Sequence, residues 1–191
     1  MMGAGKYKLL IALLMFLVIT GDINVAQDTK ESQQEQRSFS SDDPDEVFIR
    51  KPITLPDEAI QTLKNSGAGS ECLKQGHKFD AAWVVGSEVH LNSSGETAIV
   101  VMPKFFLQPP LDNSCILGAS NNTFWVLRKE DEGYQLLLET TALGLELEKS
   151  RHNGYLDITT YVHINFSETA TVYYRFDGRR YKEFKRKIAK R

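Results

Sequence analysis

The chain has 191 residues, of which 41% are hydrophobic and 25% charged, and its formal net charge is −2. Residues 47–191 are enough for one ordinary domain with a single hydrophobic core. The two cysteines do not form a C-x-x-C motif, which excludes a thioredoxin-type redox centre. The sequence also lacks a Rossmann fingerprint, a P-loop and a helical repeat.

The N-terminus has the plan of a signal peptide. Lys6 and Lys8 precede residues 9–20, which are apolar apart from the final Thr. This stretch is shorter than the roughly 20 apolar residues of a membrane-spanning helix. We therefore expect residues 1–26 to be a signal peptide and the protein to be secreted or periplasmic. The alternative is an uncleaved N-terminal segment that anchors the chain.

Residues 27–46 carry seven acidic and two basic residues, a net charge of −5, and Phe39 is their one strongly apolar residue. Such a segment cannot bury enough apolar surface to offset the entropy of ordering its backbone. We therefore predict a disordered acidic linker over residues 27–46 and a single β-rich domain over residues 47–191.

One helix is expected over residues 54–67. Pro56 suits its first turn, Asp57 and Glu58 favour the positive end of the helix dipole, and an Asn-Ser-Gly sequence ends it. After this helix, apolar residues recur at every second position, which is typical of half-buried antiparallel strands.

The clearest alternation lies near the C-terminus. In residues 157–166 the predicted core side consists of Ile158, Val162, Ile164 and Phe166. In residues 169–176 it consists of Ala170, Val172, Tyr174 and Phe176. Asp177-Gly178 then favours a hairpin. The whole pattern predicts a mainly β fold of the β-rich α+β class, with antiparallel sheets of about eight strands and one short N-terminal helix.

Cys72 and Cys115 can form one intramolecular disulfide, which an exported protein would retain in an oxidising compartment. In the chain-entropy model a loop of this length contributes about 4 kcal/mol to the free energy of unfolding. The alternative is a catalytic thiol, which would need a histidine partner that the sequence does not identify.

A stretch that begins at His90 resembles a calcium loop of the pattern D-x-N-x-D-G-x-x-D that has lost its carboxylates. Asn92 keeps its ligand position, whereas His90 and Ala98 stand at the first and last positions. Calcium prefers six to eight oxygen ligands, several of them carboxylates, and Glu96 lies between the ligand positions. We predict a β-turn here, with no metal and no cofactor.

Two segments resemble known sequences. The run "HLNSSGETAIVV" looks like the strand-turn unit of integrin-type (FG-GAP) repeats. Residues 123–183 are similar to the C-terminal half of small exported bacterial proteins, through a "GY-LLL" strand, an "NGY-DI" element and a closing "YRFDG-RY" hairpin. The resemblance implies an exported β-rich protein and carries no established function. The domain is too small for a closed propeller from one chain.

The candidate binding residues lie on the polar side of the two alternating strands. If these strands pair, they bring together Tyr161, His163, Tyr173 and Arg175. Such a face can bind a peptide or a glycan, and the simpler alternative is a solvated sheet face. No histidine stands at metal-ligand spacing, and neither H-E-x-x-H nor G-x-S-x-G occurs, so no catalytic residue is identified.

Residues 178–191 hold eight basic residues and one acidic residue, a net charge of +7. We expect a basic C-terminal tail that makes electrostatic contact with anionic surfaces and binds no nucleic acid specifically. The alternative is a solvated terminus without a partner.

These features predict a secreted or periplasmic, non-catalytic binding or interaction module whose ligand is an unknown envelope protein or glycan. One alternative is a small hydrolase that acts on envelope polymers, and another is a structural accessory protein without a ligand. A pocket around a histidine or carboxylate pair with perturbed pKa values would favour the hydrolase. A flat aromatic and basic sheet face would favour binding.

Overall fold

The computed structural model describes residues 35–40, 49–105, 113–118 and 120–190. The chain divides into two compact units, Met1–Glu35 and Gln36–Arg191. The predicted signal peptide and most of the predicted acidic linker lie outside the described residues. All the described helices and strands belong to the second unit.

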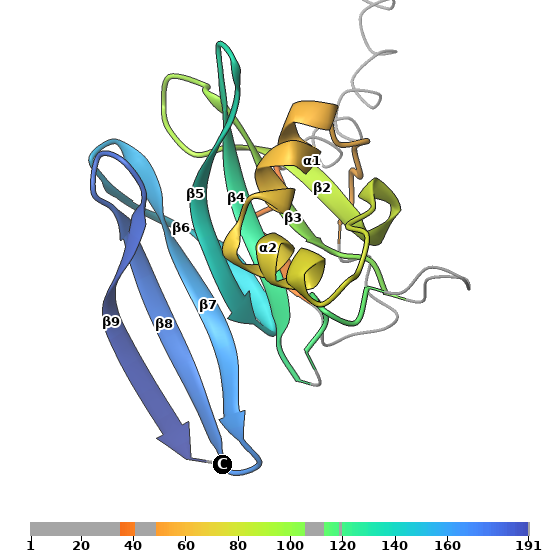
Figure 1. Ribbon diagram of the computed structural model, residues 1–191. Helices are drawn as coiled ribbons and strands as arrows, with labels where there is room; N and C mark the ends of the chain where they lie inside the picture. The colour runs from red at the N-terminus through yellow and green to blue at the C-terminus, as the bar shows by residue number, and fades with distance from the viewer. Residues whose placement is uncertain (1–34, 41–48, 106–112, 119, 191) are drawn as a thin grey trace, which may run out of the picture. The chain divides into compact units, whose positions relative to one another are not determined.

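The described residues of the second unit form nine strands in two antiparallel sheets, which confirms the predicted β-rich fold (Figure 1). One sheet has the order β2-β3-β4-β5, with bounds Val84–His90, Thr97–Pro103, Asn122–Glu130 and Gly133–Ala142. The other has the order β1-β6-β7-β8-β9, with bounds Ser38–Ser40, Gly144–His152, Tyr155–Asn165, Glu168–Phe176 and Tyr181–Lys190. Apart from the pairing of β1 with β6, every paired set of strands is consecutive in sequence, and the chain passes from one sheet to the other between β5 and β6.

Two helices, α1 (Asp57–Lys64) and α2 (Gly67–Lys74), cover the face of the β2–β5 sheet that lies away from the other sheet (Figure 1). The sequence predicted α1 and missed α2. The side chain of Ser66 caps α2 by accepting a hydrogen bond of 3.2 Å from the Gly69 N–H. A Cβ atom at Gly69 would lie 2.0 Å from the Leu63 carbonyl oxygen, so the glycine permits close packing of the two helices.

The β2–β5 sheet contributes to two hydrophobic cores. Between the helices and this sheet the core includes Leu63, Trp83, Trp125 and Leu127. Between the two sheets it includes Phe39, Phe124, Leu145, Ile158 and Phe176. Alternate residues of β4 therefore point to opposite cores, which explains why its sequence is apolar on both faces.

The predicted disulfide is confirmed. Cys72 in α2 and Cys115 in the segment before β4 are bonded, and their Cα atoms lie 5.4 Å apart. The bond belongs to the core between the helices and the β2–β5 sheet. A disulfide-bonded domain of this kind is compatible with an extracellular location.

The predicted disordered linker is wrong at β1. Phe39 pairs with Leu145 of β6, and its side chain is 1% exposed in the core between the sheets. A segment that is polar on average can thus be ordered by one aromatic residue and a free sheet edge. The β-rich unit begins at Gln36, earlier than the predicted residue 47.

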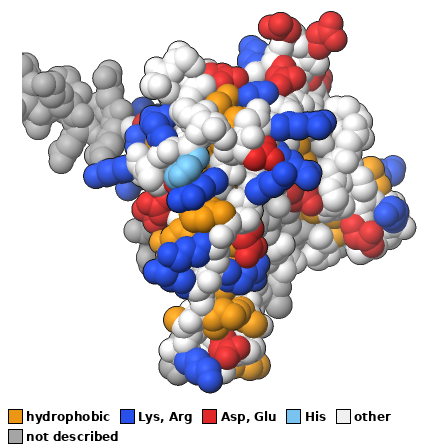
Figure 2. Space-filling view, turned by 90° about the vertical axis from the view of Figure 1, so that its left-hand side faces the viewer, with side chains coloured by type: hydrophobic (Ala, Val, Ile, Leu, Met, Phe, Trp, Pro, Cys, Tyr) orange, Lys and Arg blue, Asp and Glu red, His pale blue; other side chains and the backbone are white. Residues whose placement is uncertain are grey.

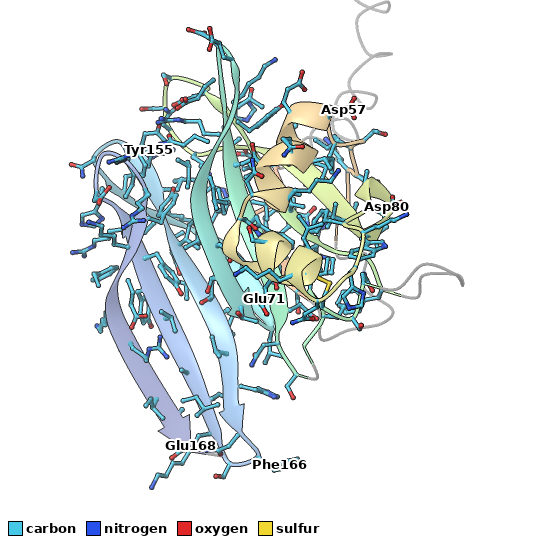
Figure 3. The ribbon with its side chains drawn as sticks, viewed as in Figure 1. Asp57, Glu71, Asp80, Tyr155, Phe166 and Glu168 are labelled. Atoms are coloured by element: carbon cyan, nitrogen blue, oxygen red, sulfur yellow. A yellow bond between two sulfur atoms is a disulfide. The ribbon has the colours of Figure 1, made fainter. Side chains whose placement is uncertain are left out.

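The predicted core side of β7 is wrong at its far end. Ile164 is exposed, and Phe166 is fully exposed at the tip of the β7–β8 hairpin, beside Glu168 (Figure 3). Figure 1 shows this hairpin extending past the end of the β2–β5 sheet, so that sheet does not cover its tip. The predicted phase of β8 is confirmed, because Ala170, Val172 and Phe176 are buried.

The predicted basic tail is an edge strand. The chain turns at Asp177 and Gly178 as predicted, and β9 then pairs with β8 from Tyr181 as far as Lys190. Lysine side chains on a sheet edge disfavour uncontrolled pairing with other strands. The basic residues of β9 therefore have fixed positions on the sheet instead of belonging to a loose terminus.

Candidate binding site

One face of strands β6–β9 packs on the other sheet, and the opposite face, here called the outer face, carries the predicted site. Tyr173 lies between Thr159 of β7 and Lys185 of β9. Tyr161 lies two residues further along β7, and Arg175 two residues further along β8. Residues that pair directly, or that are two apart on one strand, share a face. The strands thus pair as predicted and place Tyr161, Tyr173 and Arg175 on one face.

A β-bulge adds an aromatic residue to this face. The register between β8 and β9 shifts after Tyr173, which leaves Phe184 as the extra residue. The centroid of the Phe184 ring lies 6.2 Å from that of Tyr173 and 6.4 Å from that of His152. The bulge therefore directs two consecutive side chains, Phe184 and Lys185, to the outer face.

Three cations lie against these rings. The Arg175 guanidinium carbon is 3.8 Å from the Phe184 centroid. The ammonium nitrogens of Lys185 and Lys187 are 5.6 and 5.8 Å from the Tyr173 centroid. Figure 2 looks from the side on which β9 lies in Figure 1, and it shows lysine and arginine side chains gathered around hydrophobic ones. Each contact at an exposed ring contributes about 0.5–1 kcal/mol.

These three cations make no ion pair with a carboxylate in the part of the chain that the structure describes. Other basic residues of the same hairpin do. Lys182 lies 2.8 Å from Asp177, and Arg186 lies 2.7 Å from Glu183. The positive charge of the outer face is therefore held in place by aromatic rings without being neutralised.

Carboxylates gather on β6, at the other side of the outer face. The Tyr161 hydroxyl donates to Glu146 Oε2 at 3.0 Å, and the Thr159 hydroxyl donates to Glu148 Oε1 at 2.6 Å. Partial burial of the hydroxyl, and then its bond to Glu146, raises the pKa of Tyr161 to about 12. The outer face therefore carries acids along β6 and cations along β8 and β9.

His163, the fourth predicted residue, lies at the margin of this group. It is four residues along β7 from Thr159, the partner of Tyr173, which is a distance of about 13 Å along a strand. The side chain of Asn121 bonds both its main-chain N–H and its main-chain oxygen at 2.9 Å. His163 also lines an open depression of about 640 Å³ together with Phe166.

Sequence reasoning missed Phe184, Lys185, Lys187 and the two glutamates of β6. The lysines were visible as a basic run, and their two-residue spacing was the signal of a strand. Phe184 carried no such signal, because a bulge changes which side of a strand a residue faces.

A serine, a histidine and an aspartate also meet near this face. Ser150 Oγ donates to Asp157 Oδ2 at 2.7 Å, and His152 Nδ1 lies 2.7 Å from Asp157 Oδ1. In a catalytic triad the serine bonds the histidine, which in turn bonds the aspartate. Here the serine and the histidine both bind the aspartate, so this arrangement gives the hydrolase alternative no support.

The turn at Asn92 is held by hydrogen bonds and has a structural role. The Glu96 carboxylate accepts hydrogen bonds from the Asn92 amide at 2.6 Å and from the Tyr155 hydroxyl. Arg128 Nε lies 3.4 Å from the same carboxylate. Glu96 thus connects the β2–β3 turn to β7 and β4. No group of three or more metal-ligating side chains occurs within the described ranges.

No family model, curated protein or solved structure matches the chain. Where the structure describes the chain, its helices are too short or too polar for a transmembrane span.

Proposed function

We propose that the protein is exported and acts as a non-catalytic binding module, whose outer face binds an anionic partner at the cell envelope. The observation that carries this proposal is the position of Arg175, Lys185 and Lys187, which lie on aromatic rings without a carboxylate partner among the described residues. An anionic ligand would supply the missing negative charge.

The basic side chains of the outer face are already restricted in the free protein, which favours binding. Long basic side chains normally lose about 1.5–2 kcal/mol of rotamer freedom when they are fixed. Contact with Tyr173 and Phe184 restricts the three cations before a ligand arrives. Part of the side-chain entropy is therefore lost when the protein folds and need not be lost again on binding. The positive potential of these side chains also attracts anions.

The exported location rests on the signal-peptide pattern of residues 1–26 and on the Cys72–Cys115 disulfide. The resemblance to small exported bacterial proteins with an FG-GAP-like unit supports the same compartment. Recovery of the protein from the periplasm or medium of expressing bacteria, with the N-terminus beginning after Ala26, is the expected result.

Binding is tested with dextran sulfate as an anionic probe and neutral dextran as its control. We expect the exported protein to bind dextran sulfate with an affinity that falls as salt is raised. Lys185→Gln with Lys187→Gln should weaken this binding by at least about tenfold, which corresponds to 1.4 kcal/mol.

The matched control is Lys74→Gln with Lys78→Gln, which removes the same charge from exposed lysines at and after the end of α2. This variant should bind nearly as the parent does. Equal losses in both variants would mean that net charge alone drives binding, and the outer face would then not be the site. Unchanged binding in the β9 variant would lead to the same conclusion.

A further inference from the structure

The distribution of charge on the outer face specifies the chemistry of its ligand. We infer that the outer face recognises an acidic oligosaccharide, in which anionic groups lie against Lys185 and Lys187 while hydroxyl groups lie against Glu146 and Glu148. This inference rests on the proposed function and names the class of ligand.

Acids and cations are separated across the strands of this face. Glu146 pairs with Thr159 of β7, which pairs with Tyr173 of β8, which pairs with Lys185 of β9. Three strand spacings of about 4.8 Å place the two charged ends about 14 Å apart. At this separation the glutamates leave the cations without an ion pair, and a ligand that spans the face must suit both ends.

The glutamates are arranged to accept further hydrogen bonds. Glu146 and Glu148 each use one carboxylate oxygen to accept from a hydroxyl group, that of Tyr161 or Thr159. The second oxygen of each has no hydrogen-bond partner among the residues that the structure describes. A carboxylate is an acceptor only, so a ligand hydroxyl is the group that it would bind there.

The same glutamates disfavour an anionic polymer that has no hydroxyl groups to offer them. A polyphosphate that reached from β9 to β6 would place negative groups beside two carboxylates, and like charges at close range repel. In an acidic glycan each sugar carries hydroxyl groups as well as its anionic group, so the sugar that lies over the glutamates can present hydroxyls to them. The separation of charge therefore favours an acidic glycan over polyphosphate or nucleic acid.

Exposed aromatic rings on the outer face also suit a sugar ligand. Tyr161 and Phe184 are 44% and 43% exposed on this face. Their rings offer rigid apolar area, on which the C–H faces of sugar rings can pack at little cost in side-chain entropy. Tyr161 lies beside the acids and Phe184 beside the cations, so each part of the face has its own ring.

The test measures binding of three probes by calorimetry at one ionic strength. The probes are an oligomer of galacturonic acid, a polyphosphate of equal total charge, and a neutral dextran oligomer. The exported protein should bind the oligogalacturonate at least about tenfold more tightly than the polyphosphate, a difference of 1.4 kcal/mol. It should bind the neutral oligomer too weakly to measure.

Glu146→Gln with Glu148→Gln should remove most of this preference, because it weakens the acceptors for hydroxyls and relieves the repulsion of polyphosphate. Glu71→Gln with Glu132→Gln, at exposed positions in α2 and the β4–β5 turn, is the matched control and should keep the preference. The single variant Glu146→Gln repeats the test if the double variant does not fold.

The outcomes separate the two proposals. Equal binding of oligogalacturonate and polyphosphate, or a preference that survives the glutamate substitutions, overturns the acidic glycan as ligand and leaves the anion-binding face standing. Oligogalacturonate binding that is unaffected by Lys185→Gln with Lys187→Gln overturns the anion-binding face itself. Equal binding of the neutral oligomer overturns both.

Discussion

The central carbon of the Arg175 guanidinium lies 3.8 Å from the centroid of the Phe184 ring, although the two residues come from different strands. Arg175 pairs with Lys182, and only the bulge after Tyr173 brings the Phe184 ring to the same face. The contact thus joins the bulge residue of β9, Phe184, to the Arg175 side chain of β8. The geometry of the outer face therefore depends on one extra residue in an edge strand.

The contact should be measurable as a coupling energy. In a double-mutant cycle of Arg175→Ala and Phe184→Ala, we expect the free energy of unfolding to show a coupling of about 0.5–1 kcal/mol. Arg175→Ala combined with Phe166→Ala is the control, because Phe166 is fully exposed at the hairpin tip. A coupling no larger than that of the control would show that the ring does not hold the guanidinium.

Two phenylalanines near the C-terminus should differ sharply in their effect on stability. Phe176 is 3% exposed and stacks on Tyr155, with ring centroids 4.0 Å apart. Phe176→Ala should lower the free energy of unfolding by about 3–5 kcal/mol in denaturant titrations. Phe166→Ala should change it by less than about 0.5 kcal/mol. Similar losses in the two variants would mean that the core assignment of β8 is wrong.

Loss of the disulfide should destabilise the domain without changing its fold. Cys72 and Cys115 close a loop with a sequence separation of 43 residues. Replacing both by Ala should lower the free energy of unfolding by about 4 kcal/mol on the chain-entropy model. Urea titrations of the parent and the variant give this difference. An unchanged unfolding midpoint would show that the bond does not form in the exported protein.

Tyr161 should ionise at a higher pH than an ordinary tyrosine does. Burial and the bond to Glu146 raise its pKa from the ordinary 10.0 to about 12. Because the folded pKa lies above the unfolded one, the contribution of Tyr161 to stability is complete below pH 10 and is lost as the pH rises through about 12.

Glu146→Gln should lower this pKa while leaving it above 10.0, since burial is the larger cause. Titration of the tyrosine ring signals by NMR, with Tyr161→Phe to identify the residue, gives the value. An unchanged pKa of Tyr161 in the Glu146→Gln variant would show that Glu146 does not interact with the Tyr161 hydroxyl.

Local patterns predicted most of the second half of the chain. The phase of β8 follows from alternation at Ala170, Val172 and Phe176, and each strand of this meander pairs with its neighbours in sequence. The predicted face of Tyr161, Tyr173 and Arg175 depends only on that phase and on the pairing of β7 with β8. Such short-range information is present in a single sequence.

Long-range contacts account for what the sequence did not predict. β1 is ordered by Leu145, which is more than 100 residues away, and α2 depends on packing that a glycine-rich segment does not reveal. Ile164 and Phe166 continue an apolar alternation past the end of the sheet that would cover them. Phe184 reaches the outer face through a bulge that alternation cannot show.

Chemical-shift mapping is the most direct test of the central claim, which is that the outer face of β6–β9 binds the ligand. Oligogalacturonate is added to the isotope-labelled exported protein, and the shifts of its backbone amides are followed. The account predicts that the largest changes lie around Tyr161, Tyr173, Phe184, Lys185 and Lys187, with little change in α1 and α2. Changes concentrated in the helices, or no saturable change at any residue, would contradict it.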